Sequence, residues 1–195
     1  MKRIAVFFPG IGYHCDKPLM YYSRALAREA GYHEILNVGY AYQKAGLRGN
    51  AEKMRDAVLD LYAQAGEALR DVRWTDYGDI LFVSKSIGTA VAARYAAANG
   101  LICRNVFYTP VAQLFETPPH RGIAFTGTRD PWVDPAGIRE GCARAGLPLE
   151  VIEGADHSLE TGNALADLEN LQRVMKKTRA YLFGESVVEP TGRFC

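Results

Sequence analysis

Ser86 lies between an apolar run and an alanine-rich stretch, a position in which a serine can act as a nucleophile. The segment Leu81–Gly88 reads Leu-Phe-Val-Ser-Lys-Ser-Ile-Gly. A nucleophile on a sharp strand-to-helix turn needs small residues two positions to either side, because strand and helix approach closely there. Ser84 and Gly88 are small, and Ser86 would lie at the positive end of the following helix. Taken alone, the pentapeptide fits an ordinary helix N-cap equally well.

An acid and a histidine follow two later strand-like segments. Gly122–Thr126 leads into Gly-Thr-Arg-Asp, which ends at Asp130, and Leu149–Ile152 leads into Glu-Gly-Ala-Asp-His, which ends at His157. Ligands of open α/β sheets bind at the carboxyl ends of the strands. We therefore expect Asp130, His157 and Ser86 to meet at one edge, where a histidine can activate a serine and a carboxylate can orient the histidine.

Two other acids compete with Asp130. Asp134 precedes Pro135 at the start of a predicted helix, where capping explains it without catalysis. Asp156 is adjacent to His157 in sequence, so the two side chains are badly placed to pair, and we interpret Asp156 as a turn residue. Asp130 is preferred as the acid.

Apolar runs alternate with segments of helical periodicity along the chain. A parallel sheet covered on both faces is the architecture that this alternation favours. On the last helix, leucines at 165, 168 and 171 with Val174, Met175 and Leu182 are expected on the buried side. We expect one α/β domain over residues 1–183 and a tail over 184–195. Strands are expected at Arg3–Phe8, Glu34–Tyr40, Asp79–Ser84, Asn105–Tyr108, Gly122–Thr126 and Leu149–Ile152, and helices at Lys17–Ala30, Ala51–Arg70, Ser86–Ala98, Pro135–Gly146 and Asn163–Phe183.

These motifs together resemble those of the small, cap-less members of the α/β-hydrolase superfamily. Gly127–Val133 matches a Gly-x-x-Asp-x-x-Val acid segment and Gly154–His157 a Gly-x-x-His segment. The resemblance implies Ser86 as nucleophile, His157 as general base and then acid, and Asp130 as its orienting carboxylate. It also implies a doubly wound, mainly parallel six-stranded sheet of order 2-1-3-4-5-6, trimmed of the family's first hairpin. The chain departs from the pattern at Ser84, where glycine is usual.

The loop after the first strand reads Pro-Gly-Ile-Gly-Tyr over residues 9–13. By resemblance, the backbone N–H groups of Ile11 and Ile87 form an oxyanion hole, with proline at position 9 where histidine is common. The connection Thr109–Arg121 is too short for a lid domain, so we expect an open, shallow pocket. Its expected walls are Tyr13, Phe115, Trp132 and Leu159.

The composition excludes several other classes of protein. The 195 residues predict about one domain, and 23 basic against 22 acidic residues leave a net charge of +1. Such a balance does not favour nucleic-acid or membrane partners. The longest uncharged run, Ile4–Cys15, is too short to span a bilayer and reads as a strand rather than an export signal. Four scattered cysteines without a CxxC motif then favour a cytoplasmic location.

Several residues could also be interpreted as parts of other sites. Gly10-Ile11-Gly12 lacks the third glycine of a dinucleotide fingerprint, because position 15 is cysteine. Cys15 and His14 are adjacent and have no evident carboxylate partner, which does not favour a Cys/His nucleophile. For Lys85 we prefer packing of its stem over attraction of an acidic substrate, and Arg129 is expected only to pack beside the acid loop.

The sequence thus predicts a serine hydrolase that cleaves a carboxylic ester, thioester or amide, with a small-molecule acyl substrate and no cofactor. The four histidines lack HxH or HExxH spacing, so no metal site is predicted. A non-catalytic binding module on the same scaffold and an acyltransferase are the alternatives.

Overall fold

The computed structural model describes residues 1–119 and 121–185, and its six strands form one sheet. The sheet order is β2-β1-β3-β4-β5-β6, and every neighbouring pair is parallel. The order and the parallel direction confirm the sequence prediction. The strands are β1 (Lys2–Phe8), β2 (Glu34–Asn37), β3 (Tyr77–Lys85), β4 (Arg104–Tyr108), β5 (Ile123–Gly127) and β6 (Leu149–Ile152).

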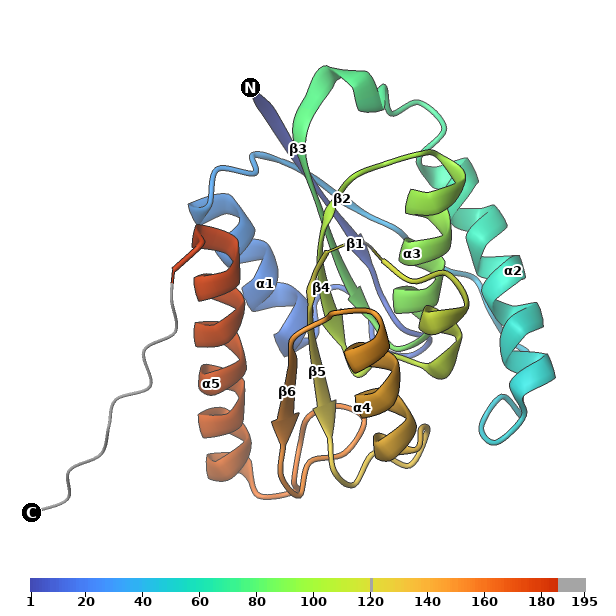
Figure 1. The fold of residues 1–195 in the computed structure, drawn as a ribbon, viewed down its shortest axis with the longest axis vertical. Helices are drawn as coiled ribbons and strands as arrows, with labels where there is room; N and C mark the ends of the chain where they lie inside the picture. Colours follow the sequence, from blue (N-terminus) through green and yellow to red (C-terminus); the bar gives the residue numbers. More distant parts are fainter. Residues whose placement is uncertain (120, 186–195) are drawn as a thin grey trace, which may run out of the picture.

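Helices cover both faces of the sheet, with α1 and α5 on one side and α2, α3 and α4 on the other (Figure 1). Alternate residues of each central strand point to opposite faces. In β1, Val6 and Phe8 pack with α2 and α3, whereas Ala5 and Phe7 pack with α1 and α5. The helices are α1 (Pro18–Glu29), α2 (Ala51–Ala68), α3 (Ile87–Ala98), α4 (Pro135–Arg144) and α5 (Ala164–Phe183), with short 3₁₀ turns η1 (Trp74–Asp76) and η2 (Ala112–Glu116).

Two expected features differ in the structure. β2 ends at Asn37 rather than at residue 40: Val38 N–H still donates to Phe7 at 2.9 Å, but the neighbouring strand then ends. Leu165 and Leu168 are exposed, at 74% and 62%. Helix α5 packs mainly against α1, and its buried residues begin only at Val174, so its first turns lie outside this contact.

The C-terminal end of α5 is capped by Gly184 in a left-handed conformation, with φ 67°. A glycine adopts this conformation without strain and so ends the helix. Of the predicted tail, residues 186–195 lie outside the described residues. No helix within 1–119 and 121–185 has the length and apolar character needed to cross a membrane.

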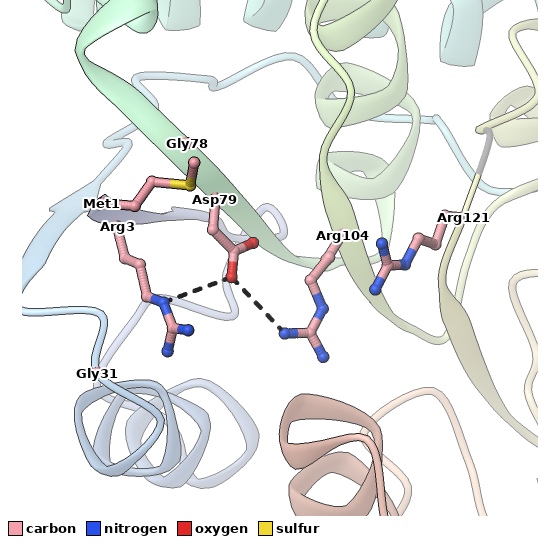
Figure 2. Close-up of a pocket in the computed structure, with 7 residues that line it drawn as sticks. All are labelled: Met1, Arg3, Gly31, Gly78, Asp79, Arg104 and Arg121. Atoms are coloured by element: carbon pink, nitrogen blue, oxygen red, sulfur yellow. Dashed lines mark ion pairs between the residues drawn. The ribbon is translucent and has the colours of Figure 1, made fainter.

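A cavity of about 550 Å³ lies where β1, β3 and β4 begin, at the edge opposite to the strand ends (Figure 2). Asp79 pairs there with Arg3 at 3.7 Å and with Arg104 at 3.9 Å. The two guanidinium groups also bind helix C-termini, Arg3 at the carbonyl of Ala30 and Arg104 at that of Leu182. Cations suit these negative helix ends, so the cluster has a structural explanation.

Candidate active site

Ser86 lies between β3 and α3 in a strained backbone conformation. Its φ is 55° and its ψ is −128°, a region that non-glycine residues rarely adopt and that costs of order 1–3 kcal/mol. Ser86 N–H donates to the carbonyl of Tyr108 at 2.9 Å, which ties the turn to β4. The strained turn places the side chain at the start of α3 without using it as a helix cap. Ser86 therefore stands at the N-cap position of α3 without the side-chain hydrogen bond of an ordinary N-cap serine.

Small residues flank the turn for different physical reasons. A Cβ atom on Gly88 would lie 2.3 Å from the carbonyl oxygen of Phe8 and 2.4 Å from that of Pro9, so any side chain would push α3 away from β1. Ser84 is fully buried, and its hydroxyl donates to the carbonyl of Val106 at 3.3 Å. The serine at the usual glycine position is therefore accommodated.

The three predicted side chains lie within hydrogen-bonding distance at the carboxyl edge of the sheet. His157 Nε2 lies 2.7 Å from Ser86 Oγ, and His157 Nδ1 lies 2.7 Å from Asp130 Oδ2. Asp130 Oδ1 accepts from Trp132 N–H at 2.8 Å, so both carboxylate oxygens are engaged. The carboxylate favours the tautomer with the proton on Nδ1, which leaves Nε2 free to accept the serine proton.

The competing acids have other roles, as expected. Asp134 is the N-cap of α4 and accepts from the amides of Ala136 and Gly137 at 3.1 and 3.3 Å. Asp156 Oδ1 accepts from the amides of Ser158 and Glu160 at 2.7 and 3.1 Å, so it stabilises the turn that follows β6. Neither carboxylate is bonded to the imidazole.

The imidazole of His157 is largely enclosed, with its side chain 15% exposed. Burial lowers the pKa of His157 because it disfavours the charged ring, and the nearby charge of Lys85 acts in the same direction, whereas Asp130 opposes the shift. Trp132 packs against the ring at a centroid distance of 5.6 Å. The histidine is consequently held in the neutral form that can accept a proton at neutral pH.

The loop after β1 approaches Ser86 closely. A Cβ atom on Gly10 would lie 3.1 Å from the Cβ of Ser86, and Tyr13 N–H closes the turn by donating to Gly10 at 3.3 Å. Ile11 lies at the corner of this turn. Ile87 begins α3, where amides lack an intrahelical acceptor. Both residues line the same cavity as Ser86.

That cavity has a volume of about 400 Å³ and contains Ser86 and His157. Of the four expected wall residues, Tyr13 and Trp132 line it. Phe115 instead lines a neighbouring cavity and packs on α4 at Gly141, while Leu159 is buried in the core at 4% exposure. One wall was missed by the sequence reasoning, namely Lys44–Leu47 in the β2–α2 loop.

That missed loop is fixed to the acid segment by Arg48, whose Nε donates to the carbonyl of Pro131 at 2.8 Å. Connections in α/β units are usually two to six residues long, and longer ones are often functional. The length of the connection over residues 38–50 is the signal that could have identified this wall.

The remaining questions from the sequence have structural answers. Burial raises the pKa of the Cys15 thiol to about 11, which keeps it protonated and argues against a Cys/His nucleophile. Arg129 is exposed and does not line the cavity. Lys85 is 1% exposed, so its stem is packed inside the protein as preferred, but its amino group is buried as well. Among residues 1–119 and 121–185, no three His, Cys, Asp or Glu side chains gather as metal ligands would.

Comparison with known proteins finds likeness in structure but not in sequence. No sequence-family model and no curated protein matches the chain. A lidless α/β serine hydrolase from Xanthomonas campestris is 17% identical with a TM-score of 0.64, covering 96% of this chain and 84% of that one. An esterase from Pyrococcus furiosus is 16% identical with a TM-score of 0.61, covering 93% and 83%. Mouse α/β-hydrolase domain-containing protein 10 is 13% identical with a TM-score of 0.64, covering 92% and 89%.

The chain therefore has the fold of the α/β-hydrolase superfamily, as the motif resemblance implied. At these identities the likeness concerns the fold, and an activity has to be argued from the site.

Proposed function

We propose that the protein is a serine hydrolase that cleaves a carboxylic ester, thioester or amide through an acyl-enzyme on Ser86. The observation that carries the proposal is the pair of 2.7 Å contacts that link Ser86 to His157 and His157 to Asp130. Nucleophile, base and orienting acid in this order and geometry are the parts needed for acyl transfer. The strained Ser86 backbone supports the same conclusion, because strain concentrates at functional sites.

In the proposed reaction, Ser86 Oγ attacks the acyl carbonyl carbon while His157 Nε2 accepts the hydroxyl proton. The N–H groups of Ile11 and Ile87 donate to the oxyanion of the tetrahedral intermediate. The imidazolium then protonates the leaving group, which departs. A water molecule, deprotonated by His157, then attacks the acyl-enzyme, and release of the carboxylic acid regenerates Ser86. Asp130 stabilises the imidazolium during both acylation and deacylation.

The cavity supports a small-molecule substrate. Within residues 1–119 and 121–185, the connection between β4 and β5, in which a lid domain would be inserted, contains only the short turn η2. Tyr13, Trp132 and Leu47 supply apolar walls for an acyl or alcohol group. A cytoplasmic location and a single catalytic domain over residues 1–183 are part of the same proposal. Cys15, Cys103 and Cys142, which are free thiols, suit a reducing compartment.

A fluorophosphonate probe tests the proposal without knowledge of the substrate. We expect stoichiometric labelling of the wild-type protein, with the adduct on the peptide that contains Ser86 and none in Ser86→Ala. Ser84→Ala is the matched control in the same turn, and it should label like the wild type because its hydroxyl only bonds a strand carbonyl. Folded protein that stays unlabelled would refute the proposal and support a non-catalytic binding module. Products formed with added alcohols or amines separate a hydrolase from an acyltransferase.

A further inference from the structure

Lys85 precedes the proposed nucleophile and carries a buried amino group that the proposed reaction does not use. It is one of the largest fully buried side chains in the described residues. No carboxylate of residues 1–119 or 121–185 lies within ion-pair distance of it. Burying an ammonium without a direct counter-ion is costly, and a methionine of similar length would fill the same space without that cost. The contacts of its Nζ atom indicate what the charge does.

The amino group joins two segments that are distant in sequence. Nζ donates to Thr109 Oγ1 at 2.6 Å and to the backbone carbonyl of His157 at 2.7 Å. Thr109 Oγ1 donates to the same carbonyl at 3.0 Å. The end of β3, the end of β4 and the loop that carries the imidazole are thereby joined at one oxygen atom.

The backbone of Thr109 is strained at this junction. Its φ is 41°, which is a strained value for a β-branched residue. Its amide donates to the carbonyl of Phe125 at 2.8 Å, which anchors the strained residue to β5. The backbone is thus held in the conformation that presents Oγ1 to both partners.

Groups around Nζ partly offset the cost of burying its positive charge. The Tyr13 ring faces the amino group at 4.9 Å from its centroid, a distance suited to a cation–π interaction. Burial lowers the pKa of Lys85 to about 7, while the carboxylates of Asp130, Asp156 and Glu160 oppose the shift. With a pKa of about 7, the amino group carries its positive charge at mildly acidic pH, the range in which the imidazole takes up its proton.

We propose that Lys85 is a positioning residue of the active site, which ties the His157 loop to β4 through the His157 carbonyl and holds a positive charge next to the imidazole. The charge opposes protonation of the ring, so that His157 remains a base at lower pH. This inference rests on the proposed function of the site, because it assigns a role relative to that base. It concerns the histidine itself, however, and can be measured without turnover.

Two measurements on Lys85→Met and Lys85→Arg test the proposal. The first follows the His157 ring by NMR during a pH titration, with the signal assigned by comparison with His157→Gln. The second is the second-order rate constant for fluorophosphonate labelling as a function of pH. The facing groups at Tyr13, Thr109, Asp130, Asp156 and Glu160 are unchanged in both variants, so a difference between them reports the lysine charge.

In Lys85→Met we expect the titration midpoint of His157 to move to higher pH, because a nearby positive charge is lost. The ratio of labelling rates at pH 6 and pH 8 should fall several-fold, because a larger share of the His157 rings is then protonated at pH 6. Lys85→Arg keeps the charge and should keep the wild-type midpoint. An unchanged midpoint in Lys85→Met would overturn the proposal, and so would a lowered one.

Thr109→Val tests the structural half and covers the case in which Lys85→Met does not fold. It removes the hydroxyl shared by Lys85 and the His157 carbonyl but keeps the branched shape. We expect a labelling rate several-fold below that of the wild type at every pH. A rate equal to the wild type would overturn the tie between β4 and the His157 loop. If the wild-type protein itself does not label, the proposed function fails, while the NMR comparison still decides the effect of the lysine charge.

Discussion

Replacing Asp130 by asparagine tests the orientation of the imidazole by a change of one atom. Asp130 Oδ1 accepts from Trp132 N–H at 2.8 Å, so the amide oxygen of the asparagine must occupy that position. Its NH₂ group then faces His157 Nδ1, where the carboxylate oxygen stood at 2.7 Å. An NH₂ donor forces Nδ1 to be the acceptor and moves the ring proton to Nε2. Nε2 then points its proton at Ser86 and can no longer accept one.

The expected loss follows from that wrong tautomer and from the missing negative charge beside the imidazolium. For the serine protease triad, the equivalent change costs roughly 10⁴-fold in rate, or about 5.4 kcal/mol in the activation free energy. We expect fluorophosphonate labelling of Asp130→Asn to slow by roughly 10³–10⁴-fold. The free energy of unfolding should change by only about 1 kcal/mol, because both polar ends of the asparagine keep partners.

Asp134→Asn is the matched control, since asparagine caps a helix about as well as aspartate does. Its labelling rate and thermal stability should equal those of the wild type. Rapid labelling of Asp130→Asn together with slow labelling of Asp134→Asn would reverse the assignment of the acid and refute the reasoning.

Four other predictions follow from single contacts. Gly88→Ala should lower the free energy of unfolding by about 1–3 kcal/mol in denaturant titrations, since its Cβ would overlap the carbonyls at the end of β1, whereas Gly66→Ala in open space on α2 should raise it by about 1 kcal/mol. Ser86→Gly should abolish labelling but raise the melting temperature, because glycine relieves the positive φ at about 1 kcal/mol; an unchanged or lower melting temperature would argue against stored strain. Arg104→Met should destabilise the fold by about 2–4 kcal/mol without changing the labelling rate, since the guanidinium binds Leu182 at the end of α5 far from the site. The wild-type labelling rate should fall only below the ordinary pKa of histidine near 6.5, because burial lowers the pKa of His157 and only the neutral ring accepts a proton; loss of labelling already above pH 7 would contradict this sign.

The strands and helices could be predicted because each is marked by residues within or next to it in the sequence. Each strand is a short apolar run bounded by turn residues, and the caps Asn50, Asp134 and Asn163 lie at the starts of their helices. The alternation of strands and helices then allows few topologies. The strand order itself came from the motif resemblance.

The parts that sequence reasoning missed depend on contacts between distant segments. Lys85 reads as a surface residue from its type, and only the junction of Thr109 with the His157 loop explains its burial. Leu165 has the periodicity of a buried face, yet the buried part of α5 begins only at Val174, which depends on how the helix packs against distant elements. The wall formed by Lys44–Leu47 depends on how a long loop folds back over the site. A loop has no periodic pattern in its sequence from which that conformation could be predicted.

The glycines of the catalytic motifs show how a short pattern can encode a long-range contact. A Cβ atom on Gly127 would lie 2.2 Å from the carbonyl oxygen of Ala155, so this glycine allows the acid loop and the histidine loop to approach each other. Gly88 allows the same for α3 and the end of β1. Ser84, in contrast, is tolerated where glycine is usual, because its hydroxyl finds an acceptor on β4 at Val106. We therefore expect motif positions to be strict only where another backbone occupies the space of the Cβ atom, and permissive where a neighbouring strand offers a hydrogen-bond partner.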